Sequence, residues 1–267
     1  MEIVVSSLPF WACAVSLLAV LPIAVNGARP DLREGFTFLA GIIKLLLVLA
    51  MLPAVLDGKV LEFTLCQILP DTALQFRVDS FGLLFALVAS SLWLVTSLYS
   101  IGYMRGLKEH AQTRFYSFFA VSLSATIGVA FSANLLTLYV FYEILSLSTY
   151  PLVTHHQDKE ARSGGRTYLT YLLGTSVGFA LPALIYVTWK TGGALDFSAT
   201  GFLVGKIGAT EALVLFLLLV FGFAKGGLMP FHSWLPGAMV APTPVSALLH
   251  AVAVVKAGVF AVLKVAV

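Results

Sequence analysis

The sequence predicts an all-α integral membrane protein with about eight transmembrane helices. Hydrophobic residues make up 59% of its 267 residues and charged residues only 11%, whereas ordinary soluble domains carry about 25% charged residues. Apolar segments recur along the whole chain, and crossing a bilayer takes about 20 such residues. A soluble core of this size cannot bury so much apolar surface, so we expect the lipid bilayer to surround the protein.

Eight apolar segments are long enough to span the membrane. The sequence begins MEIVV, with an acidic second residue and no basic region before the first segment, so we expect that segment to be a retained span and not a cleaved signal peptide. The longest connection, residues 56–79, contains the alternating runs LEFTLCQ and TALQFRV, which are typical of a short amphipathic β-hairpin. The eight segments are residues 8–25, 36–55, 80–101, 115–132, 135–153, 167–189, 211–231 and 243–267.

Basic residues in the connections predict the orientation. Cytoplasmic loops of membrane proteins carry an excess of lysine and arginine. The connections after the first, third and fifth segments contain eight of these residues and the opposite connections four. We therefore expect the first set in the cytoplasm and the N-terminus outside a bacterial or archaeal cell membrane. The two sets are Arg29, Arg33, Arg105, Lys108, Arg114, Lys159, Arg162 and Arg166, against Lys59, Arg77, Lys190 and Lys206.

Several classes of function lack a signal in the sequence. A net charge of +3 without a basic run gives no indication of nucleic-acid binding. No P-loop, dinucleotide fingerprint, haem or iron–sulfur spacing occurs, so we predict no cofactor and no catalytic residue. Cys13 and Cys66 are far apart and have no metal-ligand spacing. The short charged loop with His155, His156, Asp158 and Glu160 resembles a metal cluster, but solvent exposure explains it better, and we predict no metal site.

The stretch from 221 to 260 concentrates ionisable groups in apolar sequence. It contains Lys225, His250 and Lys256, and each charge at membrane depth costs roughly 2.5–3.5 kcal/mol on insertion scales. Glycines around Lys225 and the following Pro230 interrupt the seventh segment, and a broken helix inside a membrane must be lined by protein or water. The stretch therefore predicts a buried, hydrated path for charge. Snorkelling of Lys225 to the membrane surface is the simpler alternative.

The eighth segment carries two of these groups. His250 and Lys256 are six residues apart, which on a helix separates them by about 120° and about 9 Å. They cannot touch directly, so a water chain or the lysine stem would have to join them. Histidine suits a proton relay because its ordinary pKa is close to 6.5. Hydrogen-bonded packing of His250 is the alternative.

Glu143 lies in the middle of the fifth segment. Helical spacing places Tyr139, Ser146 and Tyr150 near the same face and gives the carboxylate a polar stripe. At an effective dielectric constant near 20, opposite charges about 4 Å apart interact by roughly 4 kcal/mol. Such a pair could change the protonation of a buried lysine. The alternative is an ion pair that only joins two helices.

Three further residues have weaker indications. Lys44 lies in the middle of the second segment, where it could act in transport, form an ion pair or snorkel. His232 follows Pro230 and could belong to the path or only pack at the helix break. Asp79 precedes the third segment, and we expect it to cap that helix.

Two stretches carry a resemblance to a known family. FYEILSLSTYPLV, and KGGLMPFHSWLPGAMVAPTPVSALLHAVAVVKAGVF further on, resemble the antiporter-like membrane subunits of respiratory complex I, Mrp-type sodium/proton antiporters and membrane-bound hydrogenases. TYPLV looks most like the Mrp D subunit. The resemblance implies that Glu143 pairs with Lys225 on an interrupted seventh span, and that His250 and Lys256 continue the proton path.

The resemblance also implies a domain organisation. Family members usually have about fourteen spans in two inverted five-helix repeats. By this analogy residues 1–110 form an N-terminal three-span region with the hairpin, and 111–267 form the first five-helix repeat. The second repeat would be absent, so either a separate chain supplies it or the sequence is a truncated form.

The function that follows is transport, not catalysis by this chain alone. The resemblance implies a proton/cation-translocating subunit of a multisubunit Mrp-type antiporter, which moves protons and a cation such as Na⁺ and assembles with other membrane subunits. One alternative is a proton-pumping subunit of a complex I-like NADH-quinone oxidoreductase or hydrogenase, which would make it part of a redox-driven translocase. A second is a scaffold subunit that transports nothing.

Overall fold

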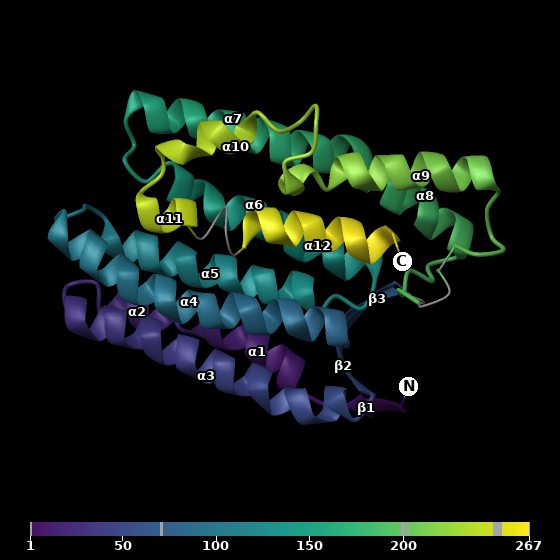
Figure 1. The fold of residues 1–267 in the computed structure, drawn as a ribbon, viewed down its shortest axis with the longest axis horizontal. Coiled ribbons are helices and arrows are strands. Elements are labelled where there is room, and N and C mark those ends of the chain that lie inside the picture. Colours follow the sequence, from purple (N-terminus) through teal and green to yellow (C-terminus); the bar gives the residue numbers. More distant parts are fainter. Residues whose placement is uncertain (1, 70–71, 199–200, 202, 248–252, 267) are drawn as a thin grey trace.

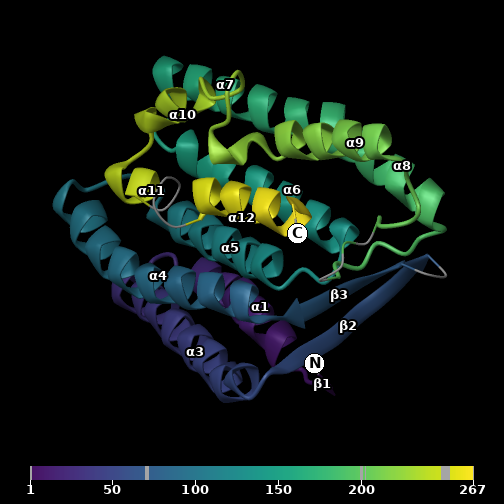
Figure 2. The same ribbon diagram turned by 45° about the vertical axis from the view of Figure 1, so that its right-hand side comes forward.

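The protein is a bundle of helices with a small β-sheet at one end (Figure 1). The structure is a computed structural model that describes residues 2–69, 72–198, 201, 203–247 and 253–266. The helices run side by side along the long axis in both views (Figures 1 and 2). The predicted all-α membrane fold is confirmed.

The helices follow the order of the eight predicted segments. α1 and α2 together form the first segment, and α7, η1 and α8 form one continuous helix that contains a π-helical turn. The first half contains α1 (Leu8–Leu18), α2 (Val20–Val25), α3 (Pro30–Leu56), α4 (Ser80–Gly106) and α5 (Gln112–Ala130). The second half contains α6 (Leu135–Val153), α7 (Lys159–Thr175), η1 (Ser176–Ala180), α8 (Leu181–Thr191), α9 (Ala209–Gly222), η2 (Ala224–Gly226), α10 (Trp234–Gly237), η3 (Ala238–Val240), α11 (Thr243–Ala247) and α12 (Val254–Ala266).

Within the described ranges, five helices are both long and apolar enough to cross a membrane. They are Leu8–Val25, Pro30–Leu56, Ser80–Gly106, Leu135–Val153 and Lys159–Thr191. The protein is therefore a multi-pass membrane protein. The remaining predicted segments differ from a simple span: α5 is enclosed by other helices, the helix expected over 211–231 ends at Gly222, and the one expected over 243–267 is represented by α11 and α12.

The predicted hairpin is confirmed, and it belongs to a three-stranded sheet. β2 (Lys59–Leu69) and β3 (Thr72–Val78) pair antiparallel, with Phe63 opposite Phe76. β1 (Glu2–Val5) adds to β2 in parallel, a strand that the sequence analysis did not predict. Four residues before the first span carry too little periodicity to reveal a strand.

Arg77 joins the sheet to the helical bundle. Its Nε lies 2.5 Å from Glu62 Oε1, and its Nη1 donates to the carbonyl of Phe197 at 2.8 Å. The backbone N–H of Arg77 donates to the carbonyl of Phe131 at 2.7 Å. The sheet is thus fixed both to the turn between α5 and α6 and to the loop that follows α8.

α5 forms the centre of the bundle. Phe115, Tyr116 and Phe119 on this helix are fully buried, and the helix packs against α1, α4, α6 and α12. Ser122 Oγ donates to the carbonyl of Phe118 within the helix at 2.8 Å, and Ser124 Oγ donates to the carbonyl of Cys13 in α1 at 2.8 Å. These serines can therefore be interior because their hydroxyl groups have hydrogen-bond acceptors.

The connections divide between the two ends of the bundle. Residues 26–29, 107–111 and 154–158 lie at one end together with α10 and α11, and the sheet lies at the other (Figures 1 and 2). At the first end Arg105 Nη2 bridges Glu34 Oε2 at 2.5 Å and Asp31 Oδ1 at 2.6 Å. This network holds the beginning of α3 against the end of α4.

Candidate functional site

The centre of the candidate site is the break after α9. The helix ends at Gly222, the single turn η2 follows, and the chain reverses at Gly227, which has a φ of 71°. Glycine adopts such a left-handed conformation at little cost. The sequence analysis predicted that glycines around Lys225 and the following Pro230 interrupt the segment 211–231. The helix ends before the lysine, at Gly222, so Lys225 lies within the break itself.

Lys225 is completely buried in this turn. Its Nζ donates a hydrogen bond to the backbone carbonyl of Tyr142 at 2.7 Å and lies 3.0 Å from the centroid of the Tyr142 ring. Its backbone N–H donates to the Tyr142 hydroxyl at 2.9 Å. A carbonyl oxygen and the face of an aromatic ring both favour a cation. The snorkelling alternative does not describe this position, because the ammonium group is enclosed.

Glu143 follows the residue that contacts Lys225. Both of its carboxylate oxygens are buried and have no hydrogen-bond partner within the described part of the chain. Its charge acts on Lys225, but the two side chains form no ion pair within 4.0 Å. The expected direct ion pair between Glu143 and Lys225 is therefore not formed in the structure, and the two side chains interact only through space. A buried carboxylate without a partner is costly, which makes Glu143 a functional candidate in its own right.

α12 passes directly against the break, and Gly258 makes this approach possible. A Cβ atom at Gly258 would lie 2.5 Å from the carbonyl carbon of Lys225 and 2.8 Å from its Cβ. Lys256 lies on an exposed part of the same helix, so the structure does not bring its side chain to Lys225. His250 lies outside the described residues.

The two secondary candidates have opposite environments. His232 is exposed. Lys44 is fully buried, its Nζ donates to Ser16 Oγ at 2.6 Å, and it lies 4.7 Å from the Trp93 ring centroid. α3, which carries Lys44, lies on the opposite side of the bundle from α9 (Figures 1 and 2). Lys44 is thus a second buried lysine, separate from the break.

Asp79 has the predicted role and one more. Its Oδ1 accepts from the backbone N–H of Gly82 at 2.6 Å, which caps α4. Its Oδ2 lies 2.5 Å from the Nζ of Lys264 in α12. This ion pair ties α12 to the beginning of α4 and fixes the helix that packs on the break.

Aromatic residues complete the surroundings of the break, and the sequence analysis missed them. Tyr142 and Phe223 meet edge-to-face with centroids 4.9 Å apart, and Trp234 meets Tyr168 in the same way at 5.6 Å. Trp234 Nε1 also donates to the carbonyl of Ala224 at 3.4 Å. The only sequence signal was that Tyr142 and Phe223 lie within two residues of Glu143 and Lys225.

The expectation that His155 is solvent-exposed is wrong. The side chain is fully buried against the end of α5. Burial, and then the charges of His110, Arg114 and His156, lower the pKa of His155 to about 4, so its imidazole is neutral at physiological pH. Asp158 caps α7 by accepting from the N–H of Ala161 at 2.7 Å.

The break places a buried amine beside a backbone carbonyl and near a buried carboxylate. The amine of Lys225 has a carbonyl acceptor when it is charged, and the nearby Glu143 carboxylate can change its charge without touching it. Comparison with known proteins identifies the family. The profile of the family described as NADH:quinone oxidoreductase/Mrp antiporter, TM, matches residues 132–267, which include both side chains. The chain belongs to this family.

Antiporter subunits are among the relatives of this NADH:quinone oxidoreductase/Mrp antiporter family member. The chain is 33% identical over 260 residues to the A-type subunit of a Na(+)/H(+) antiporter of Alkalihalophilus pseudofirmus, covering 93% of this chain and 31% of the relative. It is 34% identical over 243 residues to the A/B-type subunit of a probable K(+)/H(+) antiporter of Rhizobium meliloti, covering 88% and 24%. Both relatives are of the A type, where TYPLV had suggested the D type. The chain therefore spans about a quarter to a third of the length of these relatives.

A solved structure shares the fold. A chain of the membrane-bound sulfane sulfur reductase, an archaeal respiratory membrane complex, superposes with a TM-score of 0.84 over 96% of this chain and 52% of its own length, at 23% identity. At that identity the likeness establishes the fold alone. The family profile covers the break and Glu143, whereas Lys44 and the β-sheet lie before the matched range.

Proposed function

We propose that this family member is a proton- and cation-translocating membrane subunit of a multisubunit monovalent cation/proton antiporter. The observation that carries the proposal is Lys225, a fully buried lysine at a helix break whose only described polar partners are on Tyr142. Burying a lysine at this depth carries a desolvation cost that an apolar side chain would not have. A lysine at this position therefore indicates that its charge or its proton has a function. The names of the antiporter relatives agree with this function.

In this mechanism Lys225 carries the proton and Glu143 sets its charge. Protons reach Lys225 from the end of the bundle that carries the basic loops, and they leave towards α12, where His250 and Lys256 continue the path. Residues 111–267 form the translocating five-helix unit, and residues 1–110 support it. The partners are further membrane subunits. An ion gradient or a coupled redox module drives the movement.

Transport by the assembled complex tests this function. The complex that contains this chain is expected to dissipate a preformed pH gradient in everted membrane vesicles when Na⁺ or K⁺ is added, as followed by a pH-sensitive dye. Vesicles without this chain should show no cation-dependent response. If the gradient instead depends on an electron donor, and iron–sulfur or nickel subunits co-purify, the chain belongs to a redox-driven pump. If removing the chain changes neither response, it is a scaffold.

Orientation is a separate prediction, and the native cysteines make it measurable. Cys66 is exposed on the sheet and Cys13 is buried, while Lys108 lies in the loop between α4 and α5 at the other end of the bundle (Figure 1). A membrane-impermeant maleimide is expected to label Cys66 in intact cells. It should label a Lys108→Cys variant, made in a Cys66→Ser background, only after the cells are permeabilised. The reverse pattern would place the N-terminus in the cytoplasm.

A further inference from the structure

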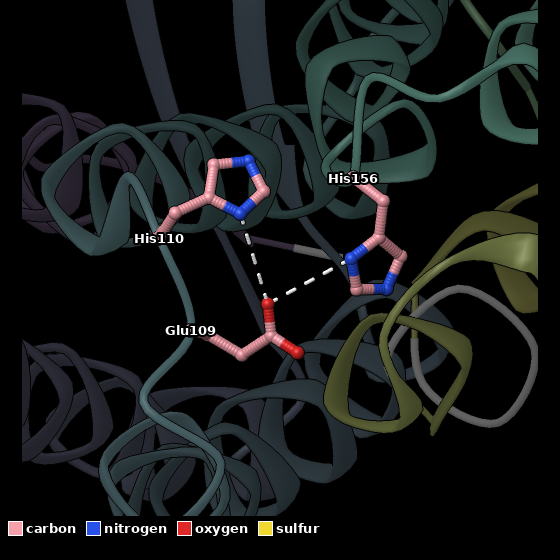
Figure 3. Close-up of side chains that lie close together, drawn as sticks. All are labelled: Glu109, His110 and His156. Atoms are coloured by element: carbon pink, nitrogen blue, oxygen red, sulfur yellow. Dashed lines mark ion pairs between the residues drawn. The ribbon is translucent and has the colours of Figure 1, made fainter.

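Two loops at one end of the bundle bring four metal-binding side chains together. Glu109 and His110 come from the turn between α4 and α5, and His155 and His156 come from the turn between α6 and α7. Figure 3 shows the Glu109 carboxylate between the rings of His110 and His156, with both Nδ1 atoms directed at it. The sequence pattern had suggested His155, His156, Asp158 and Glu160, and only the fold reveals Glu109 and His110.

One carboxylate oxygen is shared by three imidazoles at an unusual spacing. Glu109 Oε2 lies 3.9 Å from His110 Nδ1, 3.7 Å from His156 Nδ1 and 3.7 Å from His155 Nε2. Ordinary hydrogen bonds between such atoms are about 2.7–3.2 Å long. By contrast, ligands of a tetrahedral metal with bonds of about 2.0–2.1 Å lie about 3.3 Å apart. The separations from Glu109 Oε2 are too long for hydrogen bonds and exceed the spacing of tetrahedral ligands by about half an ångström.

The candidate ligand atoms are close to one another as well as to Glu109. Those of Glu109, His110 and His156 all lie within 4.8 Å of each other. His155 is fully buried beside them, its ring 4.8 Å from that of His110. Neither of its ring nitrogens has a hydrogen-bond partner of normal geometry in the described part of the chain. A buried imidazole usually satisfies at least one nitrogen, so this ring is short of a partner that a metal ion would supply.

Backbone contacts hold both loops in place. Arg114 Nη2 donates to the carbonyl of His155 at 2.8 Å, and Gln112 Nε2 donates to the carbonyl of Glu109 at 3.1 Å. Lys108, Ala111 and Gln157, which flank the cluster, have left-handed φ angles of 51°, 47° and 58°. Non-glycine residues adopt these angles at a cost of about 1–3 kcal/mol each, and such strain gathers at functional sites.

We propose that Glu109, His110 and His156, with His155 as a fourth ligand, bind a late first-row divalent cation such as Zn²⁺. Three imidazoles and one carboxylate suit zinc, cobalt, nickel or copper and are a poor set for Mg²⁺ or Ca²⁺, which prefer oxygen ligands. Four protein ligands leave no open position, as in structural zinc sites. The ion would clamp the α4–α5 turn to the end of α6, the helix that carries Tyr142 and Glu143.

Metal titration of the intact chain tests this proposal. The protein in detergent or nanodiscs is first treated with a chelator and then titrated with Zn²⁺ against a chromophoric chelator, and separately with Co²⁺. We expect one equivalent to bind, and bound Co²⁺ to give the visible absorption of a tetrahedral site. The His110→Asn and His156→Asn variants should each bind at least tenfold more weakly, since losing even an outer-sphere partner costs about 10–100-fold. Both side chains are partly exposed, so these variants should fold.

A matched control separates this site from casual binding by a surface histidine. His232 is exposed and belongs to another part of the chain, so His232→Asn should leave the binding unchanged. As an independent readout, Zn²⁺ should slow amide hydrogen exchange in residues 107–111 and 154–158 of the wild type but not of His156→Asn. Equal affinity in the wild type and in His110→Asn/His156→Asn, or no binding by the wild type, overturns the proposal.

Discussion

Replacing Lys225 by Met is expected to reduce cation-dependent proton movement to the level of vesicles that lack the protein. Methionine has nearly the volume of lysine but neither charge nor proton. Lys225 is completely buried and forms no ion pair with a carboxylate in the described ranges. Removing it therefore leaves no carboxylate without a direct ion-pair partner, and it removes the desolvation penalty of a buried charge. The variant should assemble normally and yet fail to transport.

The measurement is the vesicle assay together with quantification of the assembled complex. Lys190 offers a matched control, because its Nζ pairs with Glu211 Oε1 at 3.4 Å at a partly exposed position. Exposed ion pairs contribute about 0–1 kcal/mol, so Lys190→Met should transport like the wild type. Full transport by Lys225→Met at normal levels of complex would contradict the assignment. Low levels of complex would show that the lysine supports assembly instead.

Glu143→Gln should have a smaller effect than Lys225→Met. The amide keeps the shape of the side chain and removes the charge that acts on Lys225, while the Tyr142 carbonyl remains as the acceptor for the ammonium group. Transport is expected to fall without disappearing, in the same vesicle assay. Loss as complete as in Lys225→Met would mean that Glu143 itself carries the proton, and an unchanged rate would remove it from the mechanism.

The fold could be predicted largely because the bilayer imposes simple rules on sequence. Apolar segments of the required length and a hairpin with period-two alternation are visible without a structure. What stayed hidden depends on tertiary contacts. α5 resembles any other span in the sequence, but its serines and aromatic side chains place it inside the bundle, where nearly all of it is buried. β1 exists only because β2 offers it an edge.

The candidate site could be predicted in part, because a charged side chain in an apolar segment carries a free-energy cost that is visible in the sequence. Placing a lysine in a membrane-spanning segment costs free energy, so Lys225 and Lys44 can be identified from the sequence as functional candidates. Both are fully buried. The residues that contact these side chains could not be predicted. Nothing in the sequence indicates that the Tyr142 carbonyl accepts from Lys225, or that Glu109 lies beside His155 and His156, because these residues come from segments far apart in the sequence. The sequence alone identifies the buried ionisable side chains, whereas their contact partners depend on how the segments pack.

Gly258→Ala is expected to destabilise the protein and to impair transport together. The added Cβ would lie 2.5 Å and 2.8 Å from Lys225 atoms and closer still to the backbone nitrogen of Gly226. Alanine favours a helix over glycine by about 1 kcal/mol, whereas overpacking an interior costs about 1–3 kcal/mol. The atoms in the way are mostly backbone and cannot rotate aside, so the steric term should prevail. α12 or η2 must then move, and either movement shifts Lys225 relative to the Tyr142 carbonyl.

Thermal unfolding of the purified protein and the vesicle assay measure the two effects of Gly258→Ala. Gly174 in α7 is the matched control, since a Cβ there meets no atom within 4 Å, and Gly174→Ala should unfold no lower than the wild type and transport normally. Gly258→Ala should unfold at a lower temperature and transport more slowly per assembled complex. Lower stability with a normal rate would mean that Lys225 tolerates displacement. In that case its charge alone, and not its bond to Tyr142, would be what transport requires. Unchanged stability and rate would instead show that α12 does not press on the break as closely as the structure places it.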